Sequence, residues 1–442
     1  MGNSSSASTS SAPPVCVTPT QGPVPDCAGQ PTTLLGTVYD PAGHNPLYDV
    51  VVYVPGSPPA PLPTGATCDS CSDLYTGSPI TTTLTDAAGH FTLTNVPPGD
   101  NVPLVLQIGK WRRQLTVPNV VACQQTALTD GSLTLPKNQS EGDIPAIAVS
   151  TGGSDTLECL FRRIGIDASE YTGDPLGAGR IHIFQGTGKI VDGVAGDAPT
   201  TSNPAPSSAS ALWDTVGDLE RYDMVFLSCE GQETTNMNQE ALFDYAASGG
   251  RVFASHFHYA WFDTGPFGSW NLATWLPGPG TPAGQGADDD VDALVTTTLP
   301  NGAPFAKGHA LAQWLGTVGA LLPNGELSVD AARYNADVSA ANTASQTWLA
   351  QDSNGFAPGA PQAFSFNTPL GASPPSQCGQ VVYTAMHVSG ASNDDPEDLA
   401  VPDECATDDL SPQEAALEFL VFNLSSCVTP VAQAPQAPPS CR

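Results

Sequence analysis

The chain has 442 residues, of which 40% are hydrophobic, and its 44 acidic and 13 basic residues give a net charge of −31. This length allows two or three domains with a sizeable core. A protein this acidic is repelled by nucleic acid and by anionic lipid, so neither is an expected partner. No apolar run reaches the roughly 18 residues of a membrane-spanning helix, so we expect no transmembrane segment.

Eleven cysteines are scattered through loops rich in Pro, Gly and Asp. This usage is typical of oxidised, secreted chains. We expect about four or five disulfides and one unpaired thiol, with a pairing that the sequence leaves open. Cys68 and Cys71 form a lone CxxC, which favours a disulfide within its loop or to a distant cysteine over zinc or redox chemistry.

Residues 1–30 are rich in Ser and Pro and are expected to form a linker or tether. The stretch Gly2–Pro14 is similar to the tether that follows the cleavage point of a bacterial lipoprotein. The same start also fits an N-myristoylation signal, which would place the cysteines in a reducing compartment. We therefore expect a secreted or lipid-tethered protein, located extracellularly or at the cell surface.

Residues 31–140 have the pattern of a small all-β sandwich. Strands are expected at 33–39, 47–55 and 102–108, with a hairpin at 81–94 around the turn 86–89. Short strands at this spacing, joined by Asp, Pro and Gly turns, are typical of a β-sandwich.

The strands of this segment carry a recognisable series of residues. Gly36-x-Val-x-Asp40 is followed by the alternating valines after Asp49, by Thr85-Asp-Ala-Ala-Gly-His-Phe91 and by Val96-Pro-Pro-Gly99. The series resembles the carboxypeptidase regulatory-like domain, a prealbumin-type sandwich. The resemblance implies a non-catalytic companion module of a secreted protein. The residues before Thr81 that hold the CxxC are an insertion relative to that family, and they could reach the next domain.

The segment Lys110–Arg113 holds three of the 13 basic residues. We expect a solvated strand edge whose charges block edge-to-edge pairing. A sugar- or phosphate-binding patch is the alternative.

Residues 141–428 alternate between strand and helix. Continuous apolar strands in such a series predict an α/β domain with a flavodoxin-like, mainly parallel sheet covered on both faces. Strands are expected at 144–149, 180–184, 223–227, 251–254, 347–350, 362–366 and 379–387, and helices at 156–164, 209–219, 238–248 and 411–424.

Residues 264–345 break this alternation and are expected to form a long insertion, with one helix at about 303–318. A Pro/Ala-rich tail occupies 429–442. The whole chain is thus expected to be multidomain, a small all-β sandwich followed by an α/β domain with an insertion.

Three motifs of the α/β segment resemble the ThuA-like group of the class I glutamine-amidotransferase-like superfamily. They are Leu219-x-x-Tyr-Asp-Met-Val-Phe-Leu-Ser228, Tyr245-Ala-Ala-Ser-Gly-Gly-Arg-Val-Phe-Ala-Ser-His256 and Cys378-Gly-Gln-Val-Val-Tyr-Thr-Ala-Met-His387. The resemblance implies that His256 occupies the position of the amidotransferase nucleophile and that His387 follows a late strand. It implies a fold and a link to sugars rather than a defined reaction.

Glutaminase activity is not expected. That reaction needs a thiolate on a strand-to-helix turn, and an imidazole at position 256 cannot form the thioester. Cys229 ends the neighbouring strand but lacks the glycines of a G-x-C-x-G turn.

Ligands of open α/β sheets bind beyond the carboxyl ends of the strands, where His256 and His387 are expected. One hypothesis makes them catalytic acid–base residues together with Glu230. Another is a divalent metal site formed by His256, His258 and His387 with a carboxylate, because residues two apart on a strand share a face about 7 Å apart. The carboxylate ligand of this metal site would come from Glu230, Glu233 or Asp263. The alternative is that only one of the histidines points into the cleft and no metal is bound.

The residues around these histidines are expected to bind the substrate. Aromatic side chains there would suit stacking on sugars, and Cys229 is either the unpaired thiol or a small buried residue. The expected substrate-binding residues are Cys229, Trp261, Phe262, Asp263 and Trp270, with Trp275 as a further aromatic residue of the cleft.

The acidic runs Asp288–Asp292 and Asp394–Asp398 could bind calcium, although neither has EF-hand spacing, and solvated loops are the alternative.

Three functions remain open from the sequence. The first is a surface protein that binds carbohydrate or another cell-surface ligand through a cleft without catalysis. The second is a carbohydrate-acting enzyme that uses His256 and His387, with or without a metal. The third is a structural component of the cell surface. The oligomeric state is not indicated.

Overall fold

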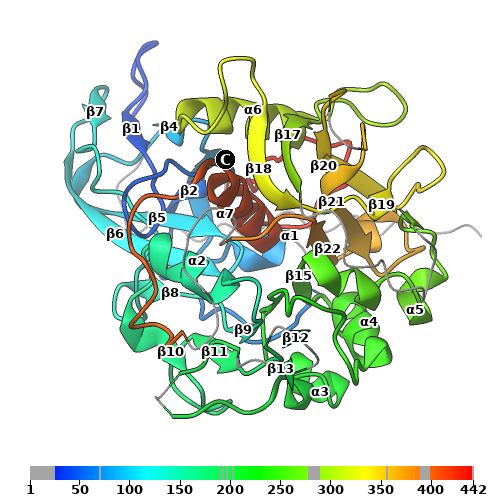
Figure 1. Cartoon of the computed structure of the whole chain (residues 1–442). Helices are drawn as coiled ribbons and strands as arrows, with labels where there is room; N and C mark the ends of the chain where they lie inside the picture. Colours follow the sequence, from blue (N-terminus) through cyan, green and yellow to red (C-terminus); the bar gives the residue numbers. More distant parts are fainter. Residues whose placement is uncertain are drawn as a thin grey trace, which may run out of the picture.

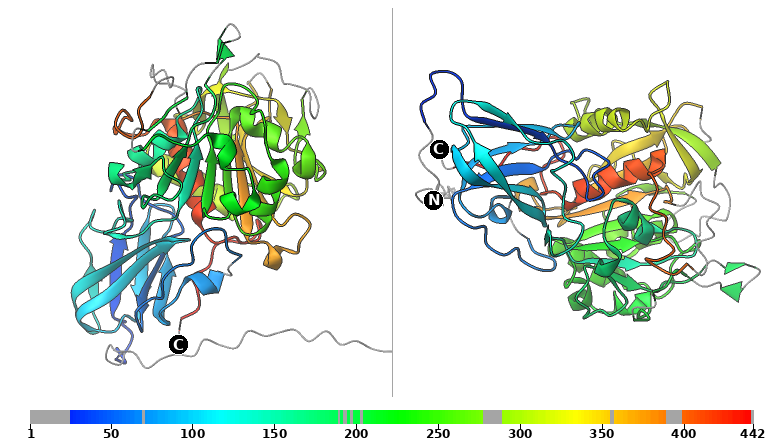
Figure 2. Two further views of the ribbon diagram at one scale, coloured as in Figure 1. Left: turned by 90° about the horizontal axis from the view of Figure 1, so that it is seen from below. Right: turned by 90° about the vertical axis from the view of Figure 1, so that its left-hand side faces the viewer.

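The computed structural model describes residues 25–68, 71–188, 190–191, 194–195, 198–201, 204–276, 289–354, 357–388 and 399–440. An N-terminal β region packs against a larger α/β region, and the long helix α7 (Pro412–Ser425) lies where the two meet (Figures 1 and 2). Among the described residues, no helix has both the length and the apolar character needed to cross a bilayer.

The N-terminal region is built from two sheets that pack face to face. Val52 and Leu104 of one sheet share a core with Leu34 and Leu93 of the other. The first sheet has the order β4 (His90–Thr94), β1 (Thr33–Thr37), β7 (Gln125–Ala127), and the second has the order β3 (Pro79–Leu84), β2 (Val51–Pro55), β5 (Gly99–Ile108), β6 (Trp111–Val120), β8 (Gly142–Asp143). The strand pairs are antiparallel except β1 with β7.

The insertion before β3 covers the outer face of the second sheet. It contains the short helix α1 (Cys71–Leu74), and Tyr75 after it packs on Val51 and Tyr53. The same insertion reaches the α/β region, because Ala66 N donates to Glu220 O (2.9 Å) and Cys68 is bonded to Cys378.

A ten-stranded mixed sheet forms the centre of the α/β region. The first six strands in spatial order are mutually parallel and the remaining four extend the sheet by antiparallel pairs. The order is β10 (Tyr171–Thr172), β11 (Ile181–Phe184), β9 (Ile147–Ser150), β14 (Met224–Leu227), β15 (Arg251–Ser255), β22 (Gly379–Thr384), β21 (Pro361–Thr368), β20 (Ser345–Gln351), β17 (Asp289–Val295), β18 (Leu327–Ala332).

The stretch 264–345 contributes to this sheet. Its strands β17 and β18 form the antiparallel edge, and its helix α6 (Ala306–Thr317) packs on β17 and α7. Two short ladders complete the strands, β12 (Ile190–Val191) with β13 (Val194–Ala195) and β16 (Thr274–Trp275) with β19 (Ala336–Asp337).

Helices cover both faces of the sheet, as the continuous apolar strands predict. In β14, Met224 and Phe226 face the core shared with the sandwich, while Val225 and Leu227 face the opposite core. The first face carries α2 (Leu157–Arg163), α6 and α7, and the second carries α3 (Val216–Leu219), α4 (Gln239–Ala247) and α5 (Gly265–Gly268) (Figure 1). The 3₁₀ helices are η1 (Ala168–Glu170), η2 (Ala209–Ala211), η3 (His256–Trp261) and η4 (Pro374–Ser376).

The helix expected at 209–219 is divided in two. It consists of η2 and α3, because the hydroxyl of Thr215 accepts a hydrogen bond from Asp218 N and so starts a new helix there. The expected single helix is therefore wrong.

Helix α7 connects the sheet to the sandwich. It begins with the expected capping box between Ser411 and Glu414. Its apolar residues are buried on all sides, as in a helix enclosed by protein. The ring of Phe422 lies 5.7 Å from that of Trp111 on β6, and the ring of Phe419 stacks 5.8 Å from that of Tyr48.

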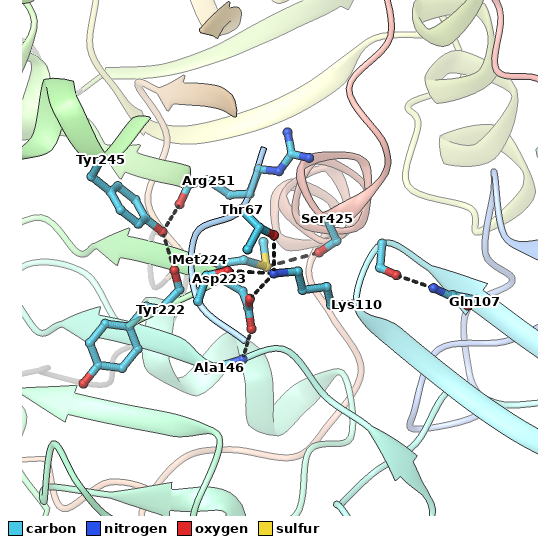
Figure 3. Close-up of polar contacts among 12 residues, drawn as sticks. Thr67, Gln107, Lys110, Ala146, Tyr222, Asp223, Met224, Tyr245, Arg251 and Ser425 are labelled. Atoms are coloured by element: carbon cyan, nitrogen blue, oxygen red, sulfur yellow. Dashed lines mark hydrogen bonds and ion pairs between the residues drawn. The ribbon is translucent and has the colours of Figure 1, made fainter. Parts of the chain in front are cut away.

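The segment Lys110–Arg113 lies at this interface and is not a solvated edge, which corrects the expectation. Lys110 Nζ donates to Asp223 Oδ1 (2.7 Å), Thr67 Oγ1 (3.0 Å) and Gly65 O (2.7 Å). Asp223 in turn accepts from Ala146 N (2.6 Å) (Figure 3). All three basic residues thus pair with acidic groups of the protein, since Arg112 Nε lies 2.9 Å from Asp143 Oδ2 and Arg113 Nη2 lies 3.5 Å from Glu141 Oε2.

Three disulfides join described residues: Cys27–Cys123, Cys68–Cys378 and Cys159–Cys405. Cys427 is also disulfide-bonded, whereas Cys229 is a buried free thiol. The bond of Cys68 to a distant residue agrees with the expectation for the CxxC. Disulfides of this number are typical of an oxidising, extracellular environment.

A buried pair of carboxyl groups, Asp40 of the sandwich and Glu418 of α7, makes the stability of this interface pH-dependent. Glu418 Oε2 accepts from Asn45 Nδ2 (2.6 Å), and both carboxyl side chains are at most 1% exposed. Burial raises the pKa of Asp40 to about 6, and burial together with the neighbouring Asp40 raises the pKa of Glu418 well above its usual value.

Because both folded-state pKa values are raised, the folded protein binds protons more tightly than the unfolded chain. The contribution of the pair is complete below the unfolded-state pKa of about 4 and is lost as the pH rises through about 6. We expect Glu418→Gln to leave stability near pH 4 almost unchanged and to raise the free energy of unfolding at pH 8 by about 1–3 kcal/mol. Urea unfolding at both pH values measures this. The exposed Glu220→Gln is the control, and an equal effect of Glu418→Gln at both pH values would refute the account.

Candidate metal centre

Three of the predicted residues meet where adjacent parallel strands end. Strands β14, β15 and β22 are paired in register up to Leu227, Ser255 and Thr384. Cys229, His256 and His387 follow these ends, and their potential ligand atoms all lie within 4.8 Å of one another. All three side chains are buried, and no other such group of His, Cys, Asp or Glu is found in the described part of the chain.

His256 is the first residue of η3 and makes a sharp turn directly after β15. Its φ is +53°, in the left-handed region that costs a non-glycine residue about 1–3 kcal/mol. The hydroxyl of Tyr383 on β22 donates to His256 O at 2.9 Å and holds the turn. The turn directs the imidazole toward the ends of the two neighbouring strands.

The side chains of the cluster are in direct contact. Cys229 Sγ lies 3.4 Å from His256 Nδ1, and Gly231 N donates to the same sulfur at 3.3 Å. The rings of His256 and His387 are 3.9 Å apart between centroids and inclined by 44°. The cluster therefore offers one sulfur and two imidazoles to a common point.

Burial favours the neutral forms of His256 and Cys229. It is the main cause that lowers the pKa of His256 well below its usual value, with further contributions from His387 and Arg333. Burial likewise raises the pKa of the Cys229 thiol. Neutral imidazole is the form that binds metals, and a bound cation would convert the thiol to a thiolate.

Asp155, which the sequence reasoning missed, links the chain segments that carry the three residues. Its Oδ2 accepts from Ser255 Oγ (2.6 Å), and its Oδ1 accepts from Val388 N (2.7 Å). Ser255 Oγ in turn accepts from Cys229 N (3.1 Å). The contacts of Asp155 are thus with neighbours of His256 and His387 and, through Ser255, with Cys229 itself.

The position of Asp155 in the sequence could have indicated that it lies near the histidines. It follows the first strand of the sheet and immediately precedes α2, which places it at the same rim as the histidines. Its carboxyl is fully buried, and burial raises its pKa to about 6 in spite of four hydrogen bonds that lower it.

We expect Asp155→Asn to weaken metal binding about 10- to 100-fold, the usual effect of removing a group that orients metal ligands. An amide cannot accept from both Ser255 Oγ and Val388 N without turning a donor toward one of them, so a stability loss of about 1–3 kcal/mol is also expected. Competition with a chelator measures the affinity of the folded protein. The exposed Asp244→Asn serves as control, and an unchanged affinity in Asp155→Asn would exclude the positioning role.

His258 does not join the cluster, contrary to the expectation. Its Nε2 is 2.8 Å from Ser228 O, and its Nδ1 is 3.2 Å from Thr234 Oγ1 and accepts from Trp261 Nε1 at 3.1 Å. Both ring nitrogens are therefore engaged by the protein. The expectation assumed an extended strand, but the strand ends at Ser255 and the two histidines lie in a 3₁₀ helix.

The predicted carboxylates also lie outside the cluster. Glu230 Oε1 accepts from Thr187 N (3.1 Å), in the loop after β11, and burial raises the pKa of Glu230 to about 7. Glu233 accepts a hydrogen bond from the hydroxyl of Tyr259. Asp263 is buried after η3. The third potential ligand is instead Cys229, which was expected only to bind substrate or to be the free thiol.

The predicted aromatic cleft is part of the hydrophobic core. Trp261 and Phe262 are fully buried and Trp275 is 6% exposed. Trp261 packs edge-on against Trp213 (5.1 Å), and Phe262 against Phe267 (5.3 Å). Trp270 is the exception, at 41% exposure. Their role in a cleft was predicted from the number of aromatic residues in this stretch. That number does not distinguish residues that stack on a ligand from residues of the hydrophobic core.

The acidic runs do not form a described calcium site. Residues 289–292 belong to β17, where Asp290 Oδ1 accepts from Ala331 N (3.4 Å). Asp288 and the run Asp394–Asp398 lie outside the described residues.

Comparison with known proteins gives limited likenesses. No family model matches the chain, and no curated protein matches it. Among solved structures, a ThuA-like protein from Bacteroides uniformis is similar over 63% of this chain and 90% of its own, with 12% identity and a TM-score of 0.32. Two mutants of a type II cohesin–X-dockerin complex from Acetivibrio cellulolyticus are similar over 31% and 28% of this chain and 85% and 78% of their own. Their identities are 12% and 13% and their TM-scores 0.18 and 0.17, so no inference about activity is drawn from any of the three.

Proposed function

We propose that the α/β region binds one divalent transition-metal ion, with zinc as the first candidate, through Cys229, His256 and His387. The observation that supports this most strongly is the convergence of three ligand atoms within 4.8 Å at the ends of three adjacent strands. Zinc bonds of about 2.0–2.3 Å place tetrahedral ligands roughly 3.5 Å apart, which small side-chain rotations can reach from this arrangement. One thiolate with two imidazoles suits zinc better than calcium or magnesium, which prefer oxygen ligands.

We further propose that this centre is catalytic. Three protein ligands leave the fourth tetrahedral position for water or substrate, as in catalytic zinc sites. The ion would supply a Lewis acid and a bound water of lowered pKa, whereas the Asp155 network would keep the ligands oriented. Of the three functions left open by the sequence, the geometry favours the enzyme with His256 and His387 at its site. The burial of the aromatic side chains removes the main support for the sugar-binding cleft.

The remaining parts of the chain fit a secreted protein. We propose that residues 31–140 form a companion module of the carboxypeptidase regulatory-like type and residues 141–428 a ThuA-like domain, tethered through residues 1–30. The sequence motifs of both regions and the disulfides support this proposal. In it, the sandwich stabilises the catalytic region and does not contact substrate.

A metal-free thiol nucleophile is the second candidate, favoured by the 3.4 Å contact between Cys229 Sγ and His256 Nδ1. The raised pKa of the buried thiol opposes it, because the thiol form is a weak nucleophile.

The two candidates differ in metal content and thiol reactivity. The protein, purified without chelator, is assayed for metal and then titrated with zinc in the presence of iodoacetamide. The metal centre predicts one ion per chain, which Cys229→Ser loses, and protection of Cys229 from alkylation by zinc, which His256→Ala loses. A chain that retains no metal and whose Cys229 is alkylated equally fast with and without zinc would overturn the proposal.

A further inference from the structure

Arg333, which had no assigned role, lies beside the proposed metal centre. It directly follows β18 and is 3% exposed. Its backbone N donates to Ala385 O (3.2 Å), and its backbone O accepts from Gln362 Nε2 (3.0 Å). Ala385 precedes His387 by two residues, so the antiparallel edge of the sheet delivers Arg333 to the rim where the parallel strands end.

The guanidinium is held over the residue that follows His256. Its central carbon lies 4.0 Å from the centroid of the Phe257 ring. Stacking on an aromatic face fixes the plane of a guanidinium and so the directions of its N–H groups. The position of the charge is therefore set by contacts at the site itself.

A positive charge at this place does not assist metal binding. The ring of Phe257 lies 5.1 Å from that of His256, so the guanidinium stacked on Phe257 lies beside the proposed ligands. Its charge repels a divalent cation, so the arrangement costs metal affinity. Two neighbouring cationic centres, an ion and a guanidinium, are instead complementary to a negatively charged oxygen group.

We propose that the metal centre and Arg333 together bind an oxyanion, so that the substrate of this site carries a carboxylate or phosphate group. This inference rests on the proposed metal centre. One oxygen of the group occupies the fourth position of the metal, and another accepts from the guanidinium edge. Two fixed positive charges, the metal ion and the guanidinium, attract the negatively charged group. A neutral molecule of the same shape is attracted much less by either of them.

The test uses the full chain loaded with zinc, and acetate, inorganic phosphate and the neutral acetamide as probes, titrated by calorimetry at constant ionic strength. At least one of the two anions is expected to bind at least about tenfold more tightly than acetamide, since a charge-assisted hydrogen bond contributes that much or more. Preference for acetate or for phosphate identifies which group the site takes. Arg333→Gln is expected to lower the affinity of the preferred anion at least about tenfold, and Arg333→Lys to restore part of it.

Two controls separate this inference from the metal centre. Arg221, exposed on the surface and paired with Asp218, is replaced by Gln and should change nothing. The zinc affinity of Arg333→Gln should equal or exceed that of the original chain, because a repelling charge is removed.

Failure to bind zinc would refute the metal centre. Zinc binding with no anion preference over acetamide, or with equal anion affinity in Arg333→Gln, would overturn the role of Arg333 and leave the metal centre standing. The comparison with acetamide needs no variant, and an absent anion preference would refute the inference even if Arg333→Gln does not fold.

Discussion

Replacing His256 by alanine is expected to lower the zinc affinity of the protein at least about 100-fold, whereas replacing His258 leaves the affinity of the folded protein within about threefold. The two histidines are two positions apart and equally buried, at 1% exposure. Only His256 takes part in the converging cluster with Cys229 and His387 among the described residues. Loss of one of three ligands removes several kcal/mol of binding free energy, and no other His, Cys, Asp or Glu of the described residues joins the cluster.

His258→Ala serves as the matched control because its expected defect is different. It breaks the contacts with Ser228 and Trp261 and should lower stability by about 2–4 kcal/mol, without changing the ligand set. Zinc affinity is measured by chelator competition below the unfolding temperature of each variant. Equal losses of zinc affinity in the two variants, or a larger loss in His258→Ala, would show that the ligands have been misassigned.

Lys110→Met is expected to lower the free energy of unfolding by about 3–5 kcal/mol, the usual cost of leaving one partner of a buried ion pair without the other. The side chain of Asp223 is 8% exposed and that of Lys110 is 14% exposed. Burial raises the pKa of Asp223, and the charge of Lys110 is the chief cause that opposes this rise. Without the ammonium group, the carboxylate must either remain unpaired or take up a proton (Figure 3).

Urea unfolding at neutral pH measures the loss, and two further variants define its origin. The double variant Lys110→Met with Asp223→Asn should recover part of the stability, because it leaves no buried charge. Arg221→Met, which breaks an exposed pair, should change stability by less than about 1 kcal/mol. Asp223 precedes β14 and Cys229 follows it, so the zinc affinity of folded Lys110→Met should be unchanged. A loss no larger than that of Arg221→Met would contradict the assignment of the pair as a buried link between the two regions.

Elements with a strong local pattern could be predicted from the sequence. The alternating valines of β2, the apolar run of β14 and the Ser-Pro start of α7 each determine their own structure over a few residues. The parallel strands around β15 followed from the same reasoning, and with them the rim where His256 and His387 lie. The strand-end rule predicted that His256 and His387 lie at one rim, because it depends on topology and not on side-chain contacts.

The identities of the ligands could not be predicted in the same way. The sequence pattern predicts that the strand continues through His258, but the chain turns at His256 with a positive φ. The turn is held by a tertiary contact, the hydrogen bond from the hydroxyl of Tyr383 to His256 O, which the local sequence does not reveal. Cys229 was weighed as a thiol and not as a ligand, because its distance to His256 depends on how β14 and β15 pair.

The other differences between prediction and structure arise from contacts between residues that are far apart in the sequence. Lys110 resembles a solvated edge residue until its partner, 113 positions later, is known. Asp155 and Arg333 are single charged residues without a motif, and their roles depend on the strands that bring them to the rim. The aromatic residues after β15 were expected in a cleft, but Trp261, Phe262 and Trp275 belong to the second core, where the helices of that face need apolar partners.

X-ray absorption at the zinc edge of the loaded, full-length protein tests the proposed centre most directly. The account predicts a first shell with one sulfur at about 2.3 Å and at least two nitrogen donors at about 2.0–2.1 Å, and loss of the sulfur signal in Cys229→Ser. A protein that retains no zinc at one ion per chain, or whose zinc has no sulfur neighbour, would contradict it.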